Sequence, residues 1–340
     1  MNEELKMAMC APMAPPPLFR RLWSKILARA GTISPEETSV GRRGFSADDP
    51  AVVARLEEIG AHFVDGYNHA IGACDIGELA SALSAYERDN AGFVYEGAAM
   101  GVAIADFLTP GNSFFGAYLE GPGAAHEYMA WVGLGWALAR LPVAPERFLA
   151  RYRNLNCWLA LDGYGFHEGY FHWPKRIVAQ RRPRLSADGL HVFDQGLGRS
   201  LWFVKGADPH LVASCIDTFS PDRQADLWAG VGLAAAYAGG TRPDVYNTLL
   251  LVGAAHACSL AQGVVFATQA RQRAGSAVPH IEQACERILK LDVPSVAAIA
   301  VSTIPDSGAS LSHYQQWRFA IQRRCAVASP HLNHRRMGAA

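Results

Sequence analysis

The chain has 340 residues, of which half are hydrophobic and 18% are charged, with 31 basic and 31 acidic side chains. A chain of this length can form one large domain or two ordinary ones, and its apolar content supplies a sizeable core. Because the charges cancel, no overall field attracts nucleic acid or an acidic membrane surface, and we expect no nucleic-acid partner.

The cysteines and the apolar runs indicate a cellular compartment. Seven cysteines are present, an odd number without a C-x-x-C pair, and most lie in apolar helical runs. Buried free thiols are usual there and fit a reducing cytoplasm. No apolar run approaches the roughly 18–20 residues that cross a bilayer, and residues 1–17 lack the order of a secretory signal. We therefore expect a cytoplasmic protein without a transmembrane segment.

The N-terminal part divides into two segments. Residues 1–17 are rich in Met, Ala and Pro, which predicts disorder. In residues 18–49, an amphipathic helix over Leu18–Ala30 precedes a polar linker, and its charged face is basic. Such a helix can bind a membrane or a partner, but packing against the main domain is the simpler interpretation.

From residue 50 to residue 325 a helical pattern recurs. Gly-x-x-x-small segments begin at Gly66, Gly133, Gly196 and Gly253. In the first three a second anchor follows, and these anchors are Glu96-Gly97, Asp162-Gly163 and Ala229-Gly230. β-Branched alternation is nearly absent, which excludes a substantial sheet. We predict an all-α domain of three to four degenerate repeats, each of two to three helices, packed as one solenoid-like or toroidal domain. Residues 326–340 are predicted to form a disordered tail.

Titratable and aromatic residues are most concentrated in residues 159–174, LALDGYGFHEGYFHWP. Asp162 and Glu96 occupy equivalent repeat positions, each just before a glycine. They are either first-turn acids that complement the helix dipole or paired carboxylates facing one cavity, where desolvation raises a pKa. The third repeat has Ala229 at this position. Since a helix cap is needed in every repeat, whereas a site needs its acid only in some, this alanine favours the interpretation as a site. His167 and Glu168 have no counterpart in the other repeats, and we add them as candidate catalytic residues.

His167, Glu168 and His172 invite comparison with the zinc-binding H-E-x-x-H helix. Here the histidines are five apart, about 140° around a helix, so a shared metal would need outside ligands such as His126 and Glu127. Glu168 and His172 have i,i+4 spacing and can meet. No P-loop and no strand-anchored G-x-G-x-x-G is present. We expect no metal and no other cofactor.

Further candidates lie outside this stretch. Asp194 and Arg199 are five apart, so each is expected to have another partner. Arg199 shares its repeat position with His69, Trp136 and His256, and such a column would line the binding face of a solenoid. The candidate substrate contacts are Tyr164, His172, Asp194, Arg199, Trp136 and His126. The many aromatic residues suit an apolar, polyunsaturated ligand.

Several long motifs resemble those of a known family. They are FVYEGAAMG (93–101), GLGWALARL (133–141), LDGYGFHEGYF (161–171), FDQGLGRSLWF (193–203) and DLWAGVGLA (226–234). Over residues 45–325 the chain resembles a bacterial family catalogued as a domain of unknown function, whose members are often encoded beside enediyne polyketide synthases. The resemblance implies a natural-product context but no particular reaction or catalytic residue.

Three functions follow as hypotheses. The first is an accessory or tailoring enzyme of specialised metabolism, a cofactor-independent cyclase or isomerase that moves protons on an apolar polyene intermediate. It predicts one closed, aromatic-lined pocket that contains both Asp162 and Glu168. The second is a non-catalytic helical-repeat scaffold or carrier that binds a synthase or an apolar product in an open groove. The third is a metal-dependent oxidative enzyme. A homodimer is compatible with each.

Overall fold

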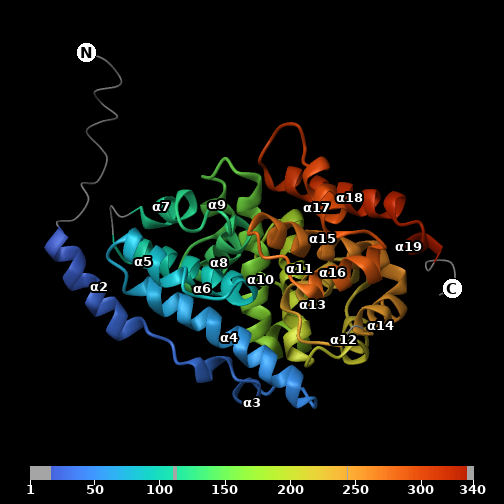
Figure 1. The fold of residues 1–340 in the computed structure, drawn as a ribbon, viewed down its shortest axis with the longest axis horizontal. Helices are drawn as coiled ribbons and strands as arrows, with labels where there is room; N and C mark the ends of the chain where they lie inside the picture. The colour runs from blue at the N-terminus through green and yellow to red at the C-terminus, as the bar shows by residue number, and fades with distance from the viewer. Residues whose placement is uncertain (1–16, 110–112, 243, 335–340) are drawn as a thin grey trace.

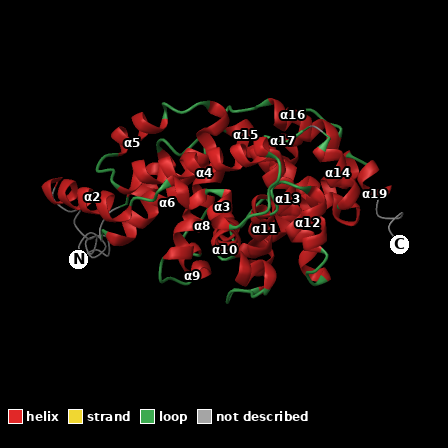
Figure 2. Ribbon diagram, turned by 90° about the horizontal axis from the view of Figure 1, so that it is seen from below, coloured by secondary structure: helices red, strands yellow, loops and turns green. Residues whose placement is uncertain are grey.

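The computed structural model describes residues 17–109, 113–242 and 244–334, and within these ranges it is all-helical, as predicted (Figure 1 and Figure 2). The elements of the first half are α2 (Pro17–Gly31), η1 (Pro35–Thr38), α3 (Val40–Arg43), α4 (Pro50–Ile71), α5 (Ile76–Leu83), α6 (Arg88–Leu108), α7 (Phe114–Glu120), α8 (Glu127–Arg140), α9 (Pro145–Leu149), η2 (Leu155–Trp158) and α10 (Leu159–Phe171). Those of the second half are η3 (Pro174–Val178), α11 (Ala187–Val204), α12 (Pro209–Ile216), α13 (Pro221–Ala238), α14 (Val245–Val252), η4 (Ala254–His256), α15 (Ala257–Arg273), α16 (Pro279–Ala284), η5 (Cys285–Leu289), α17 (Val293–Ser302), α18 (Leu311–Ala328) and α19 (His331–His334).

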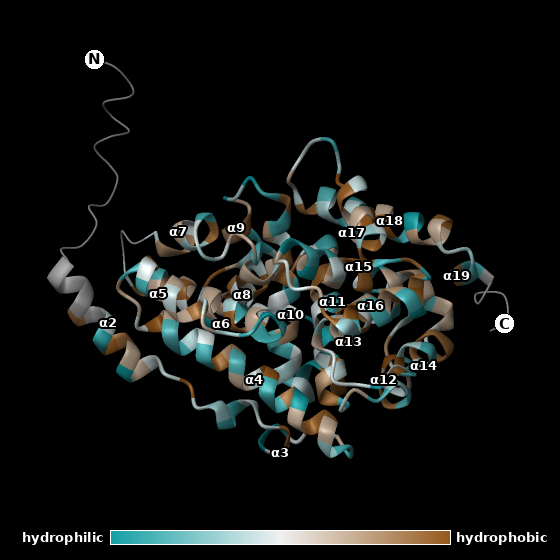
Figure 3. Cartoon of the chain, in the orientation of Figure 1, coloured by the Kyte–Doolittle hydropathy of each residue, from teal (hydrophilic) through white to brown (hydrophobic). Residues whose placement is uncertain are grey.

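Seven helices form the centre of the molecule. They are α4, α6, α8, α10, α11, α13 and α15, and each packs against the next in this order. The series also curves back on itself, because Arg271 of α15 donates to the carbonyl of Asp89 in α6 (2.7 Å) and Arg55 of α4 donates to the carbonyl of Ala238 at the end of α13 (2.9 Å). The remaining helices cover the outside. Along the central helix α4 and the outer helix α5, hydrophilic and hydrophobic turns alternate (Figure 3).

Glycines hold neighbouring central helices in close contact. At the crossing of α8 and α10, a Cβ on Gly163 would lie 2.0 Å from the carbonyl oxygen of Val132, and a Cβ on Gly135 would lie 2.0 Å from that of Ala160. The same reciprocal arrangement occurs between α4 and α6, α10 and α11, α11 and α13, and α13 and α15. A glycine costs about 1 kcal/mol in a helix interior, so this close backbone approach is the physical reason for the recurring glycines.

The fourth predicted repeat segment, which begins at Gly253, does not lie among the central helices. Gly253 ends α14 and faces the ring of Trp228, outside the central helices. Gly263 of α15 instead makes the contact with α13, where its Cβ would lie 2.0 Å from the carbonyl oxygen of Ala229. Sequence spacing alone could not separate the two glycines, since both lie in small-residue apolar runs. The arrangement in degenerate repeats of two to three helices stays a prediction.

The ends of the chain differ partly from expectation. The amphipathic helix is present as α2, which packs on α4; Leu27 is buried, whereas Leu22 and Ile26 are exposed. The linker contains the short helices η1 and α3. Residues 326–334, predicted as disordered, are mainly helical, because Leu332 is fully buried and His331 Nε2 contacts the carbonyl of Ile288 (3.0 Å). Residues 1–16 and 335–340 of the predicted disordered ends lie outside the described residues.

One described helix is long and apolar enough to cross a membrane, contrary to the expectation from the sequence. This helix is α6, and a bent pair, Val245–Val252 with Ala254–Arg273, meets the same measure when taken together. Of the apolar window in α6, 83% is buried inside the protein. A core helix has the same length and composition, and the position of α6 between α4 and α8 explains its apolar character.

Candidate functional site

The central helices enclose a small apolar cavity. Its main wall residues are Phe63 of α4, Phe93 and Glu96 of α6, Trp136 of α8, Phe166 and Tyr170 of α10, Arg199 and Phe203 of α11, and Leu233 and Tyr237 of α13. The volume of the cavity is about 40 Å³, which is room for about three water molecules. Thr38 of η1 also lines this cavity, and its carbonyl accepts from Tyr170 Oη (2.9 Å).

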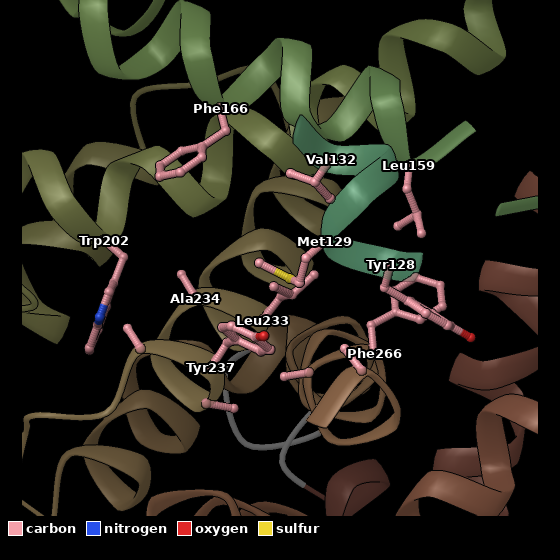
Figure 4. Packing of buried hydrophobic residues seen from close by; sticks show 14 of the residues in the cluster. Tyr128, Met129, Val132, Leu159, Phe166, Trp202, Leu233, Ala234, Tyr237 and Phe266 are labelled. Atoms are coloured by element: carbon pink, nitrogen blue, oxygen red, sulfur yellow. The ribbon is translucent and has the colours of Figure 1, made fainter. Parts of the chain in front are cut away.

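A second, smaller cavity adjoins the first. The two share Arg199, Leu233 and Tyr237 as wall residues, and the second is bounded further by Met129 and Phe266. Its volume is about 20 Å³. Figure 4 shows Met129, Leu233 and Tyr237 converging where the central helices meet. The two cavities are therefore neighbouring parts of one apolar interior.

Glu96 is the acid of this interior. It is 2% exposed, and Oε1 accepts from Trp136 Nε1 (3.0 Å) and lies 3.9 Å from Arg199 Nη2. Burial raises the pKa of Glu96 to about 7, against the opposing effects of Arg199 and Trp136. Glu96 is the ninth residue of α6, so its interpretation as a first-turn acid is wrong. A carboxyl group with this pKa both accepts and donates a proton near neutral pH.

Arg199 links the two predicted carboxylates. Its Nη1 donates to Asp162 Oδ1 (2.5 Å), and its guanidinium lies over the ring of Phe166 (4.7 Å). Burial lowers the pKa of Arg199, but Asp162 and Glu96 raise it more, so the guanidinium stays charged. Asp162 does lie in the first turn of α10. It is fully buried behind Arg199 and is absent from the cavity wall, so Glu96 alone presents its carboxyl group there.

Asp162 is also part of a longer buried network. Its Oδ2 accepts from Gln195 (2.7 Å), whose Oε1 accepts from Arg318 Nε of α18 (3.0 Å). Arg318 in turn donates to Asp226 (2.7 Å), and Asp226 contacts His191 (2.6 Å), which is 41% exposed. The hydrogen bond to Asp226 raises the pKa of His191. The network satisfies the buried charges and joins α18 to the centre of the molecule.

Asp194 belongs to a separate ion-pair cluster. Arg223 donates to both of its oxygens (2.5 and 2.9 Å), and Arg182 lies 3.1 Å from Oδ2. The prediction that Asp194 and Arg199 have different partners is confirmed. Because Asp194 is paired twice and lies outside the cavity wall, its carboxylate is structural in this state.

The histidine cluster, His167, Glu168 and His172, lies near the cavity but does not line it. The ligand atoms of its members come within 4.8 Å of one another, since α10 ends at Phe171 and His172 leaves helical geometry. The prediction from helical spacing that the side chains of His167 and His172 point in different directions is therefore wrong. Glu168, however, forms a double hydrogen bond with the guanidinium of Arg176.

This pairing decides what Glu168 can do. Burial raises its pKa, but His167 and Arg176 outweigh burial and lower it to about 2. His167 Nδ1 lies 3.8 Å from Glu168 Oε1, and burial lowers the pKa of His167. The predicted pocket that would contain both Asp162 and Glu168 is not formed, because Trp136 packs between the cavity and His167 (5.5 Å between ring centroids).

The other predicted residues are dispersed. Of the predicted column, Trp136 and Arg199 meet at Glu96, whereas His69 contacts Tyr86 (3.2 Å) and His256 contacts Gln224 (3.4 Å). Tyr164 packs against Phe193 (5.7 Å). His126 stacks on Tyr95 (4.1 Å), and burial lowers its pKa to about 4. Neither Tyr164 nor His126 lines the cavity.

Two residues of the cavity wall and the buried network were not singled out in the sequence. Tyr237 lines both cavities, and Arg318 joins the buried network from the C-terminal helix. Tyr237 ends a small-residue run in α13 and looks like any core aromatic, while the partners of Arg318 are far away in the chain.

Comparison with known proteins supplies a family and no function. No curated protein and no solved structure matches the chain. One family model matches residues 22–325, which include all seven central helices and the network around Glu96. The chain therefore belongs to the family described as "Protein of unknown function (DUF1702)".

Proposed function

We propose that the protein is a cofactor-independent enzyme that isomerises or cyclises an apolar polyene intermediate by acid–base chemistry. The observation that carries the proposal is Glu96, a buried carboxyl group with a pKa of about 7 in an aromatic-lined cavity. The motifs that resemble a family encoded beside enediyne polyketide synthases support an accessory role in that type of pathway, in the cytoplasm.

The chemistry follows from the contacts of Glu96. In the ionised form it accepts a proton from a substrate carbon, and in the protonated form it returns the proton to another carbon. Trp136 fixes the carboxyl group through Oε1, and Arg199 balances its negative charge. Asp162 compensates the positive charge of Arg199. Arg199 lowers the pKa of Glu96 and Asp162 raises it, so the carboxyl group is not held in the ionised form. The aromatic walls bind apolar groups and exclude water.

The size of the cavity limits what binds in this state. About 40 Å³ accommodates one end of a polyene or a small group, but not an extended polyene. The reacting end is therefore expected at Glu96, with the rest of the chain directed along the cavity toward Thr38, where η1 forms the wall.

Complementation in the producing organism tests the proposal. Deletion of the gene should accumulate a precursor that mass spectrometry detects, and the wild-type gene should restore the product. Glu96→Gln, which keeps the acceptor for Trp136, should fold and yet leave the precursor unconverted. Glu282→Gln, a change at an exposed residue of α16, is the matched control and should restore product.

A carrier for an apolar product is the alternative that the same cavity favours. Binding alone needs the aromatic walls but not the proton of Glu96. Full product formation with Glu96→Gln would therefore refute the enzyme and support the carrier. The third hypothesis, a metal-dependent oxidative enzyme, finds no support in the histidine cluster, because Arg176 already neutralises Glu168.

A further inference from the structure

Two hydrogen-bond donors beside Glu96 have no partner among the described residues. They are Arg199 Nε and Tyr237 Oη, and both side chains are at least 95% buried. Each residue lines both cavities. An unpaired buried polar group destabilises the folded protein, so a ligand that supplies an acceptor at this point would be stabilised by these donors.

The position of Tyr237 is set by its neighbours. Arg271 lies over its ring (4.1 Å) and donates to its carbonyl (2.7 Å), and Phe93 packs edge-on against it (5.3 Å). Its hydroxyl lies against Gly92 of α6, where a Cβ would come within 1.9 Å of the oxygen. The absence of a side chain at Gly92 thus creates the space that this hydroxyl occupies.

This placement puts Tyr237 Oη close to Glu96. Gly92 and Glu96 are four residues apart on α6 and so lie on the same helix face, one turn from each other. Arg199 reaches the same carboxyl group from α11, with Nη2 3.9 Å from Oε1. Two donors from two different helices therefore lie near one buried carboxyl group.

We propose that Tyr237 Oη and Arg199 Nε bind the carbonyl oxygen of the substrate, which makes the substrate class a conjugated carbonyl compound with an apolar chain. This inference rests on the proposed function of Glu96 and specifies it. Tyr237 is then a catalytic residue, because it touches the oxygen on which charge develops.

The reaction balances without an added reagent. Glu96 takes a proton from a carbon next to the carbonyl, or from the carbon attached to the far end of the conjugated double bonds. The electrons of the broken C–H bond form a new C=C bond. The π electrons of the carbonyl move to oxygen, where the two donors stabilise the enolate. The proton then returns from Glu96 to a different carbon, the carbonyl re-forms, and a double bond has moved.

Binding of a small ketone to the purified full-length protein tests this inference. The probe is pent-3-en-2-one, a methyl ketone conjugated with one double bond, which is labelled with carbon-13 at the carbonyl and is short enough for the small cavity. The matched ligand is the hydrocarbon in which a methylene group replaces the carbonyl oxygen. We expect the ketone to bind about thirtyfold more tightly, the effect of two hydrogen bonds worth about fivefold each, and its carbonyl resonance to move downfield on binding.

Variants separate the roles of the residues. Tyr237→Phe should lower the preference for the ketone to about fivefold and reduce the downfield shift, because only Arg199 then donates to the carbonyl oxygen. Gly92→Ala should do the same by displacing the hydroxyl without removing it. In heavy water the wild-type protein should exchange deuterium into the bound ketone. Glu96→Gln should keep the shift and lose this exchange.

The two proposals fail in different ways. No binding of the ketone, equal affinity for the two ligands, an unmoved carbonyl resonance, or an unchanged shift in Tyr237→Phe would overturn the carbonyl site. A shifted resonance without deuterium exchange in the wild-type protein would instead refute proton transfer by Glu96 and leave the carbonyl site standing.

Discussion

Glu96→Gln provides a quantitative test of the buried acid through protein stability. Glutamine has nearly the same shape and keeps an oxygen that accepts from Trp136, but it does not ionise. In the wild-type protein burial raises the pKa of Glu96 from 4.5 to about 7. The folded state therefore binds this proton more tightly than the unfolded state does.

The sign and size of the effect follow from that difference. Below pH 4.5 both states hold the proton, and the group adds no pH dependence. Between pH 4.5 and about 7 the unfolded state ionises first, so the stability of the wild-type protein falls as pH rises. The loss is complete above pH 7 and amounts to about 3 kcal/mol. Glu96→Gln should remove this loss.

Urea denaturation at pH 4.5, 6 and 8 measures the prediction. All other titrating groups cancel when the free energies of unfolding of the two proteins are subtracted at each pH. Relative to the wild type, Glu96→Gln should become more stable by about 3 kcal/mol between the lowest and the highest pH. A difference that stays constant with pH would show that Glu96 titrates normally in the folded protein, and the assignment of Glu96 as the acid–base group would lose its basis.

Three further changes test the fold and the neighbouring sites. Gly163→Ala should lower the free energy of unfolding in urea by about 3 kcal/mol, since its Cβ would meet a carbonyl oxygen of α8 at 2.0 Å. Gly116→Ala is the matched control: a Cβ there has nothing within 4 Å, so the change should be neutral or stabilising by up to about 1 kcal/mol. Arg318→Met should lower the free energy of unfolding by about 4 kcal/mol because it leaves Asp226 buried with only His191 as partner. A decrease below about 1 kcal/mol would contradict a charged network. Added Zn²⁺ should leave the thermal midpoint unchanged, because the guanidinium of Arg176 occupies Glu168 in the histidine cluster; a rise in the midpoint would reveal a metal site instead.

The local density of titratable groups was a poor guide to the site. Residues 159–174 combine two carboxylates and two histidines with five aromatic residues, yet Glu168 is neutralised by Arg176 and Asp162 by Arg199. Glu96 looked equivalent to Asp162 from its position before a glycine. Its pKa differs from that of an ordinary carboxyl group because it faces a cavity and has only a distant cation, and neither property is local in sequence.

The sequence by itself determined the helical class of the protein and the residues available for packing. Apolar periodicity without β-branched alternation excludes a sheet, and the spaced glycines mark where one helix backbone can touch another. Only the tertiary structure decided which of these groups meet. Glu96, Arg199 and Tyr237 come from α6, α11 and α13, more than thirty residues apart in the chain, and their proximity depends on how the central helices curve around one cavity. Burial and charge pairing there set the pKa of Glu96 and leave two donors unpaired, because desolvation depends on what surrounds a group in space and not on its neighbours in the chain.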